Sequence, residues 1–181
     1  MAKHLNDWQS HREQISNLSA LKYNYDATVY QASTEKMGWN IDQHRATLGV
    51  EPPGAPTPEG IFERAKVAIA NYEFPDPKLI SAIYDPSQEL DGRNMLLRAQ
   101  FAGMTFFFGV RVSRVIDEER KNEAGNDTKM WGYAYRTLQG HYEIGEITFV
   151  VKKDLVTGEV SFYIDAYSKP DKIPNLIHRL G

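Results

Sequence analysis

The chain has 181 residues, of which 41% are hydrophobic and 25% are charged, so it is long enough for one domain with a substantial core. A net charge of −3 argues against a dedicated nucleic-acid-binding protein, which would carry a basic patch. The sequence contains no cysteine, which excludes disulfides, thiolate metal sites and a thiol nucleophile and fits a cytoplasmic setting.

The first part of the chain predicts an arm followed by a strand. Residues 6–20 place Trp8, Ile15 and Leu18 among polar residues, which indicates a short amphipathic helix. Residues 21–43 are rich in aromatic side chains but have no period. We therefore expect residues 1–43 to form an arm that packs on the domain through its rings. A strand is predicted over 41–49, and residues 44–181 are expected to form a single domain.

A helix is predicted after a proline-rich break at residues 51–56. Thr57 is the expected N-cap, and Pro58 takes the first helical position. Apolar residues then recur at helical spacing from Ile61 to Tyr72, until Pro75 ends the pattern.

The apolar period changes from about 3.6 to about 2 after this helix, which indicates strands. Residues 118–128 are expected to form a charged hairpin loop. One helix and a curved antiparallel meander of six to seven strands make an α+β fold. The inner face of such a sheet needs a cover, and only the start of a helix follows Pro174. The predicted strands cover residues 79–84, 95–101, 104–113, 131–137, 146–153 and 160–167.

The segment 131–146 is the most informative part of the sequence. Its first half alternates aromatic and hydroxyl side chains with small residues, so one face of the strand is aromatic. It then turns at Gln139-Gly140 and gathers ionisable groups, which together suit a ligand pocket. The alternative is a core strand whose hydroxyls find partners at its edge. The candidate ligand-binding residues are Trp131, Tyr133, Tyr135, Thr137, His141, Glu146 and Tyr167.

The ionisable groups of this segment allow three interpretations. The first interpretation is a metal site, because imidazole and carboxylate groups bind metals. Its candidate ligands are His141, Glu143, Glu146 and His44. The same histidine and glutamates are candidates for general acid–base catalysis. The third interpretation is a hairpin corner in which His141 bonds to backbone. We predict no metal and no cofactor, because the convergence of these groups is not indicated and the glycine spacing fits no phosphate-binding loop.

Four blocks of sequence carry a family resemblance: residues 22–26, 44–49, 131–146 and 166–170. Together they resemble the uncharacterised family called domain of unknown function number nineteen-ninety, which occurs in bacteria and in plants, where a relative sits in the chloroplast outer envelope. The resemblance covers residues 22–181. Family members usually continue in a basic helix beyond a Leu-Gly like Leu180-Gly181, so we expect a short or truncated C-terminal helix here. The order of elements is similar to helix-grip domains of the birch-pollen-allergen and START type, in which a helix roofs a cavity for apolar ligands.

These features lead to one functional prediction and two alternatives. We predict a cytoplasmic domain that holds a small apolar or amphipathic ligand between sheet and helix. The sequence favours binding over catalysis but leaves an enzymatic role open. The first alternative is an enzyme that uses His141 with Glu143 or Glu146 as an acid–base pair. The second is a membrane-associated or pore-forming protein, implied only by the plant relative. We expect no nucleic-acid partner, and an uncovered sheet face would favour a homodimer.

Overall fold

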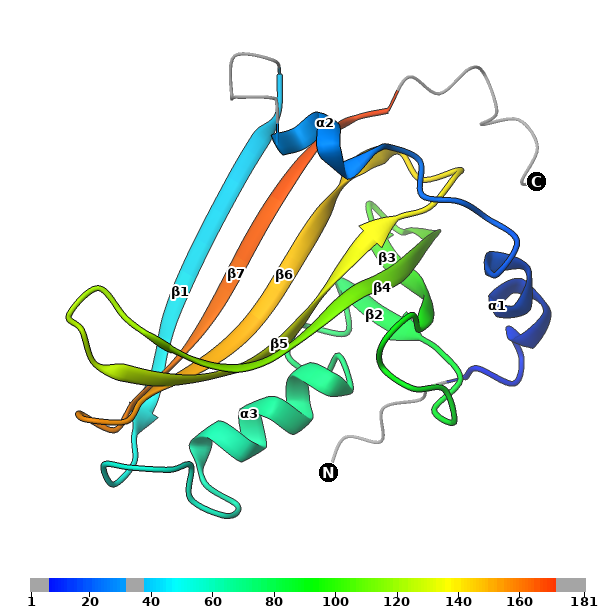
Figure 1. The fold of residues 1–181 in the computed structure, drawn as a ribbon. Coiled ribbons are helices and arrows are strands. Elements are labelled where there is room, and N and C mark those ends of the chain that lie inside the picture. Colours follow the sequence, from blue (N-terminus) through cyan, green and yellow to red (C-terminus); the bar gives the residue numbers. More distant parts are fainter. Residues whose placement is uncertain (1–6, 32–37, 172–181) are drawn as a thin grey trace.

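The computed structural model describes residues 7–31 and 38–171, and its main element is one antiparallel sheet of seven strands. The strand order is β1-β7-β6-β5-β4-β3-β2, so β2 to β7 form a meander and β1 joins it beside β7. Figure 1 shows that this sheet is strongly curved. The strands are β1 (Asn40–Val50), β2 (Ile80–Ile83), β3 (Asn94–Phe101), β4 (Met104–Lys121), β5 (Asp127–Thr137), β6 (Glu143–Asp154) and β7 (Glu159–Pro170).

Three helices flank the sheet within the described residues: α1 (Arg12–Leu18), α2 (Ala27–Gln31) and α3 (Ile61–Ala70). Helix α3 contacts β5 and β6, and α1 contacts β3 (Figure 1). The two helices lie on opposite faces, because Leu96 packs with α1 while its neighbours on the strand pack in the core with α3. The α+β fold with a curved antiparallel sheet of six to seven strands, expected from the sequence, is confirmed, with seven strands.

The main core fills the concave face of the sheet beneath α3. Phe62 and Ile69 of the helix are each 1% exposed, as the apolar spacing of this segment predicts. They pack with a set of residues on facing strands, including Tyr133 of β5 and Phe149 of β6, which are paired directly in the sheet register. Burial of these side chains is the main contribution that holds α3 on the sheet.

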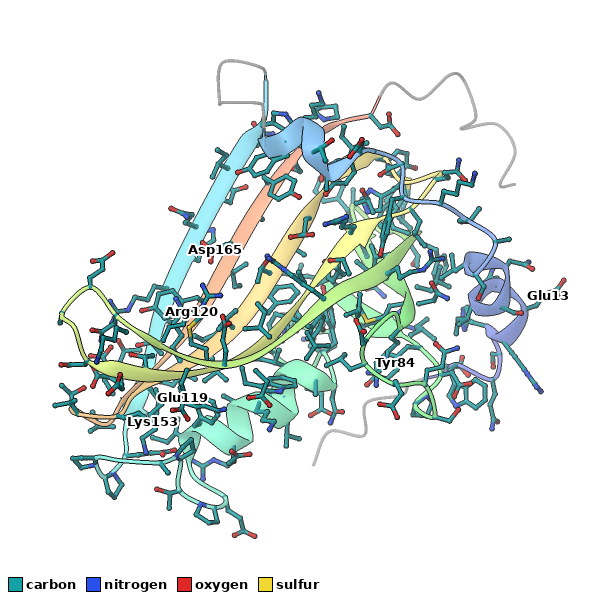
Figure 2. All side chains as sticks on the ribbon, viewed as in Figure 1. Glu13, Tyr84, Glu119, Arg120, Lys153 and Asp165 are labelled. Carbon is teal, nitrogen blue, oxygen red and sulfur yellow. The ribbon has the colours of Figure 1, made fainter. Side chains whose placement is uncertain are left out.

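A buried ion pair fastens the proline-rich segment and the start of α3 to the sheet. Lys153 of β6 is fully buried, and its Nζ lies 2.7 Å from the carboxylate of Glu51 and 3.0 Å from the carbonyl oxygen of Ala55. The same carboxylate accepts hydrogen bonds from the backbone N–H groups of Thr57 and Phe62. Figure 2 shows Lys153 at this end of the sheet. The carboxylate thus satisfies an N–H group of the first helical turn.

Two local expectations were wrong. Thr57 is not the N-cap of the helix: α3 begins at Ile61 after Gly60, and the carboxylate of Glu51 takes the capping role from outside the local sequence. The expected loop 118–128 is mostly strand, because β4 continues to Lys121 and β5 begins at Asp127. A cross-strand ion pair between Lys121 and Asp127 at 2.9 Å lies within this extension, and one between Asp117 and Lys129 at 2.8 Å lies next to it.

Two further expectations concern where the sheet begins and the helix that was expected after Pro174. Strand β1 covers Asn40–Val50, which matches the strand predicted over 41–49 and overlaps the end of the segment 1–43 that was expected to form the arm. The helix expected after Pro174 lies outside the described residues.

Candidate functional site

The aromatic face of β5 lies on the concave side of the sheet, as its alternation predicts. Tyr133 is completely buried, Tyr135 is 8% exposed, and Trp131 is 7% exposed. Helix α3 covers this end of the strand, and the Nζ of its Lys66 lies 5.4 Å from the ring centre of Trp131. The three rings therefore form an aromatic wall within the packed core between α3 and the sheet.

Phenolic hydroxyls gather within this apolar core. The hydroxyls of Tyr72 and Tyr135 lie 3.4 Å apart, and that of Tyr84 donates to the carbonyl oxygen of Asn71. The buried hydroxyl of Tyr133 has no hydrogen-bond partner among the described residues. Burial raises the pKa of Tyr72, Tyr133 and Tyr135, so these groups stay neutral at physiological pH.

The core opens into a partly exposed apolar surface on the same face. Five large side chains pack against the edge of the core without being fully buried, and they come from the segment after α3 and from β4, β6 and β7. An apolar surface that ends at a few hydroxyls suits a ligand with one polar end. These side chains are Phe74, Phe108, Ile147, Phe162 and Ile164.

His141 lies at the rim of this surface. Its ring centre is 5.0 Å from that of Phe108, and its Nδ1 accepts a hydrogen bond from the backbone N–H of Glu143 at 3.0 Å. Burial lowers the pKa of His141 to about 4, so the ring is neutral at pH 7. The side chain of Glu143 is exposed. His141 therefore adopts the hairpin-corner arrangement that the sequence left open.

Glu146 faces the opposite, convex side of the sheet. Its carboxylate accepts hydrogen bonds from Arg136 Nε at 2.7 Å, Arg114 Nη2 at 3.2 Å and Ser113 Oγ at 3.1 Å. Next to it on β6, Ile147 pairs with Tyr135 in the register and shares the concave face. The structure therefore does not bring Glu146 together with His141, and Glu146 is held in a cluster of arginines.

The remaining two candidate residues contact the arm. Thr137 Oγ1 donates to Asn24 Oδ1 at 2.6 Å and accepts the N–H of Gly145. Tyr167, on the convex side, has its hydroxyl 2.9 Å from that of Tyr25 and its ring stacked on Tyr30 at 3.5 Å. Tyr167 is therefore separated by the sheet from the aromatic wall of β5.

Three of the four sequence blocks that carry the family resemblance meet here: residues 22–26 of the arm, 131–146 and 166–170. The centre of the Tyr23 ring lies 5.7 Å from the guanidinium group of Arg111 and 5.4 Å from that of Arg136. Arg111 also donates to the carbonyl oxygens of Leu18 and Leu21. These contacts attach the arm to the convex face.

Sequence reasoning missed Tyr72 and Tyr84 as members of the site. Tyr72 was counted as an apolar position of the helix, whereas it follows α3 with a φ of 57° and its hydroxyl reaches Tyr135. The sequence feature that could have indicated this role of Tyr72 is its hydroxyl, because a purely apolar residue would fill a core position equally well.

Fold and site together define an α+β domain with a curved antiparallel sheet and an apolar concave face. The chain belongs to the family described as domain of unknown function DUF1990, whose profile matches residues 23–180. Among solved structures, the chain is similar to one titled "Crystal structure of Ara h 8.0201", with 14% identity, a TM-score of 0.42, and coverage of 76% of this chain and 82% of that one. A search of curated proteins found no match.

Two further observations concern the described residues alone. None of the helices in residues 7–31 and 38–171 is long and apolar enough to cross a membrane. Within the same residues, no group of three or more histidine, aspartate or glutamate side chains is placed to hold a metal ion.

Proposed function

We propose that this domain binds a small amphipathic molecule on the concave face of the sheet, beside α3. The apolar part of the ligand packs on the half-buried side chains around Phe108 and Ile164. Its polar end reaches inward to the buried phenolic hydroxyls of Tyr72, Tyr133 and Tyr135. The observation that carries the proposal is the Tyr133 hydroxyl, which is buried in an apolar core without a partner among the described residues.

An unpaired hydroxyl in a core is unfavourable by about 1–3 kcal/mol. A phenylalanine at this position would fill the same space without that cost, so packing alone does not account for the tyrosine. A ligand oxygen that accepts from Tyr133, with Tyr72 and Tyr135 close by, offsets the cost. The proposal assigns no reaction, because the carboxylate of Glu146 is bound by Arg136 and Arg114.

Native mass spectrometry of protein purified from cells, before and after denaturation, tests this function directly. Extra mass that is lost on denaturation supports a bound ligand and identifies it. Ile164→Gln should reduce the ligand-bound fraction, because it makes the concave face polar. Asp165→Gln, a change at the next residue on the exposed convex face, should leave it unchanged. A protein that is ligand-free in every preparation, or equal ligand occupancy in both variants, would contradict the proposal.

A further inference from the structure

A cavity lies on the convex face of the sheet, on the opposite side from Tyr133 and Tyr135. It has a volume of about 690 Å³, within the usual range for small-molecule sites. Its roof is the tip of the long hairpin between β4 and β5, and its floor is the convex face of β6, β7 and β1. Arg120 of this hairpin lies over the strands (Figure 2).

Four cationic side chains from three different parts of the sheet line this cavity: Arg45, Arg120, Lys121 and Lys152. The whole chain has a net charge of −3, so this concentration of cations is a local feature. Three carboxylates also line it, and two of them are already engaged. Convergent cations around a cavity favour anionic ligands.

The two engaged carboxylates are Asp154 and Glu159. Asp154 accepts hydrogen bonds from the side-chain amides of Asn122 and Asn126 and from two backbone N–H groups, which lower its pKa to about 2. Glu159 accepts from Ser161 Oγ and forms an ion pair with Arg45. These contacts fix the hairpin tip and the floor of the cavity relative to each other.

Lys152 differs from the other three cations because no carboxylate in residues 7–31 and 38–171 forms a salt bridge with it. Its Nζ lies 4.0 Å from the ring centre of Tyr163, and the guanidinium of Arg45 lies 5.4 Å from the same ring. Two cations therefore share one aromatic ring at the floor of the cavity. A half-buried ammonium group without a counter-ion is favourably placed to bind an oxyanion.

We propose that this convex-face cavity binds a small molecule with a multiply charged oxyanion, and that Lys152 and Arg45 contact the anionic group. Phosphate esters and polycarboxylates share this chemistry. The site is independent of the concave face, because Lys152 and Tyr163 point to the opposite side of the sheet from Val151 and Phe162, which pack in or against the main core.

Isothermal titration with sodium pyrophosphate and with sodium citrate, at matched ionic strength, tests the proposal on the full chain. We expect at least one probe to bind, and Lys152→Met to weaken its binding by about tenfold. Lys152→Arg keeps the charge and should retain binding. Lys78→Met, which removes an exposed lysine outside the cavity, is the matched control and should not change the affinity.

The two probes separate the ligand classes: binding of pyrophosphate alone indicates a phosphate ester, and binding of citrate alone a polycarboxylate. Absence of binding by either probe up to about 10 mM would overturn the proposal. So would equal affinities of the wild type and Lys152→Met. Circular dichroism shows whether each variant is folded, and Lys152→Arg keeps the test valid if Lys152→Met fails to fold.

Discussion

The buried pair of Glu51 and Lys153 gives a prediction about stability. Replacing Lys153 by methionine preserves the volume of the aliphatic chain but leaves the carboxylate of Glu51, which is 6% exposed, without its cation. Breaking a buried pair on one side costs about 3–5 kcal/mol. Because the Lys153 ammonium also bonds to Ala55, the proline-rich segment loses a second attachment. We expect Lys153→Met to lower the free energy of unfolding by at least about 3 kcal/mol.

The pH dependence gives a separate estimate of the same interaction. Burial acts to raise the pKa of Glu51, but the hydrogen bonds from Lys153, Phe62 and Thr57 outweigh it and hold the pKa at about 2. A fall from the ordinary glutamate value of about 4.3 to about 2 corresponds to about 3 kcal/mol. The folded-state pKa is lowered, so this stability is present above about pH 4.3 and is lost as the pH falls towards 2.

Urea unfolding, followed by tryptophan fluorescence at pH 7 and at several lower pH values, measures both effects. Glu51→Gln should unfold more easily at pH 7 and should lose less stability than the wild type between about pH 4.3 and 2. Lys121→Met is the matched control, because its pair with Asp127 is exposed and is expected to contribute less than about 1 kcal/mol. A loss below about 1 kcal/mol in Lys153→Met, or an unchanged pH profile in Glu51→Gln, would refute the reasoning.

Two further substitutions and one titration have defined outcomes. Gly132→Ala should destabilise the protein by about 2–3 kcal/mol or more in urea unfolding, because the new Cβ would overlap the backbone of Phe149 and Val150; an unchanged midpoint would contradict this. Arg136→Met leaves Glu146 with Arg114 and Ser113 only, and we expect a loss of about 2 kcal/mol at pH 7, which the same assay measures. The His141 ring signal in NMR should titrate with a midpoint near pH 4, and stability should fall by up to about 3 kcal/mol from about pH 6.5 to 4, because the unfolded histidine binds its proton first; a midpoint near 6.5 would count against its burial.

The elements predicted best from sequence are those whose pattern is local. The spacing of apolar residues from Ile61 to Ile69 predicts the buried face of α3. The alternation of aromatic and small residues in 131–137 predicts the buried face of β5. The N-cap was mispredicted because Glu51, which bonds to Phe62, is 11 residues away from it. The flanks of the hairpin tip were mispredicted because charges such as Lys121 and Asp127 resemble a loop, although they pair across strands.

The candidate site was predicted less well than the fold, because it depends on register and on distant contacts. Strand alternation alone does not place Glu146, since the turn between β5 and β6 decides which face it takes. The observed pairing of Tyr135 with Ile147 puts Glu146 on the convex face. Tyr72 and Tyr135 are 63 residues apart in the chain, and no local pattern connects them.

The position of β1 has a consequence for folding kinetics. Its pairing partner is β7, and the register joins Asn40 to Ser168 and Val50 to Glu159. During synthesis β1 leaves the ribosome long before β7, so it remains unpaired until β7 is made. Strands β2 to β6, in contrast, can pair with their neighbours in sequence. The unpaired β1 carries charged and polar side chains such as Asp42 and Arg45, which limit its association with other chains. Closure of the loop between β1 and β7 is expected to be the slow step of folding, because non-local pairing incurs the largest chain-entropy cost.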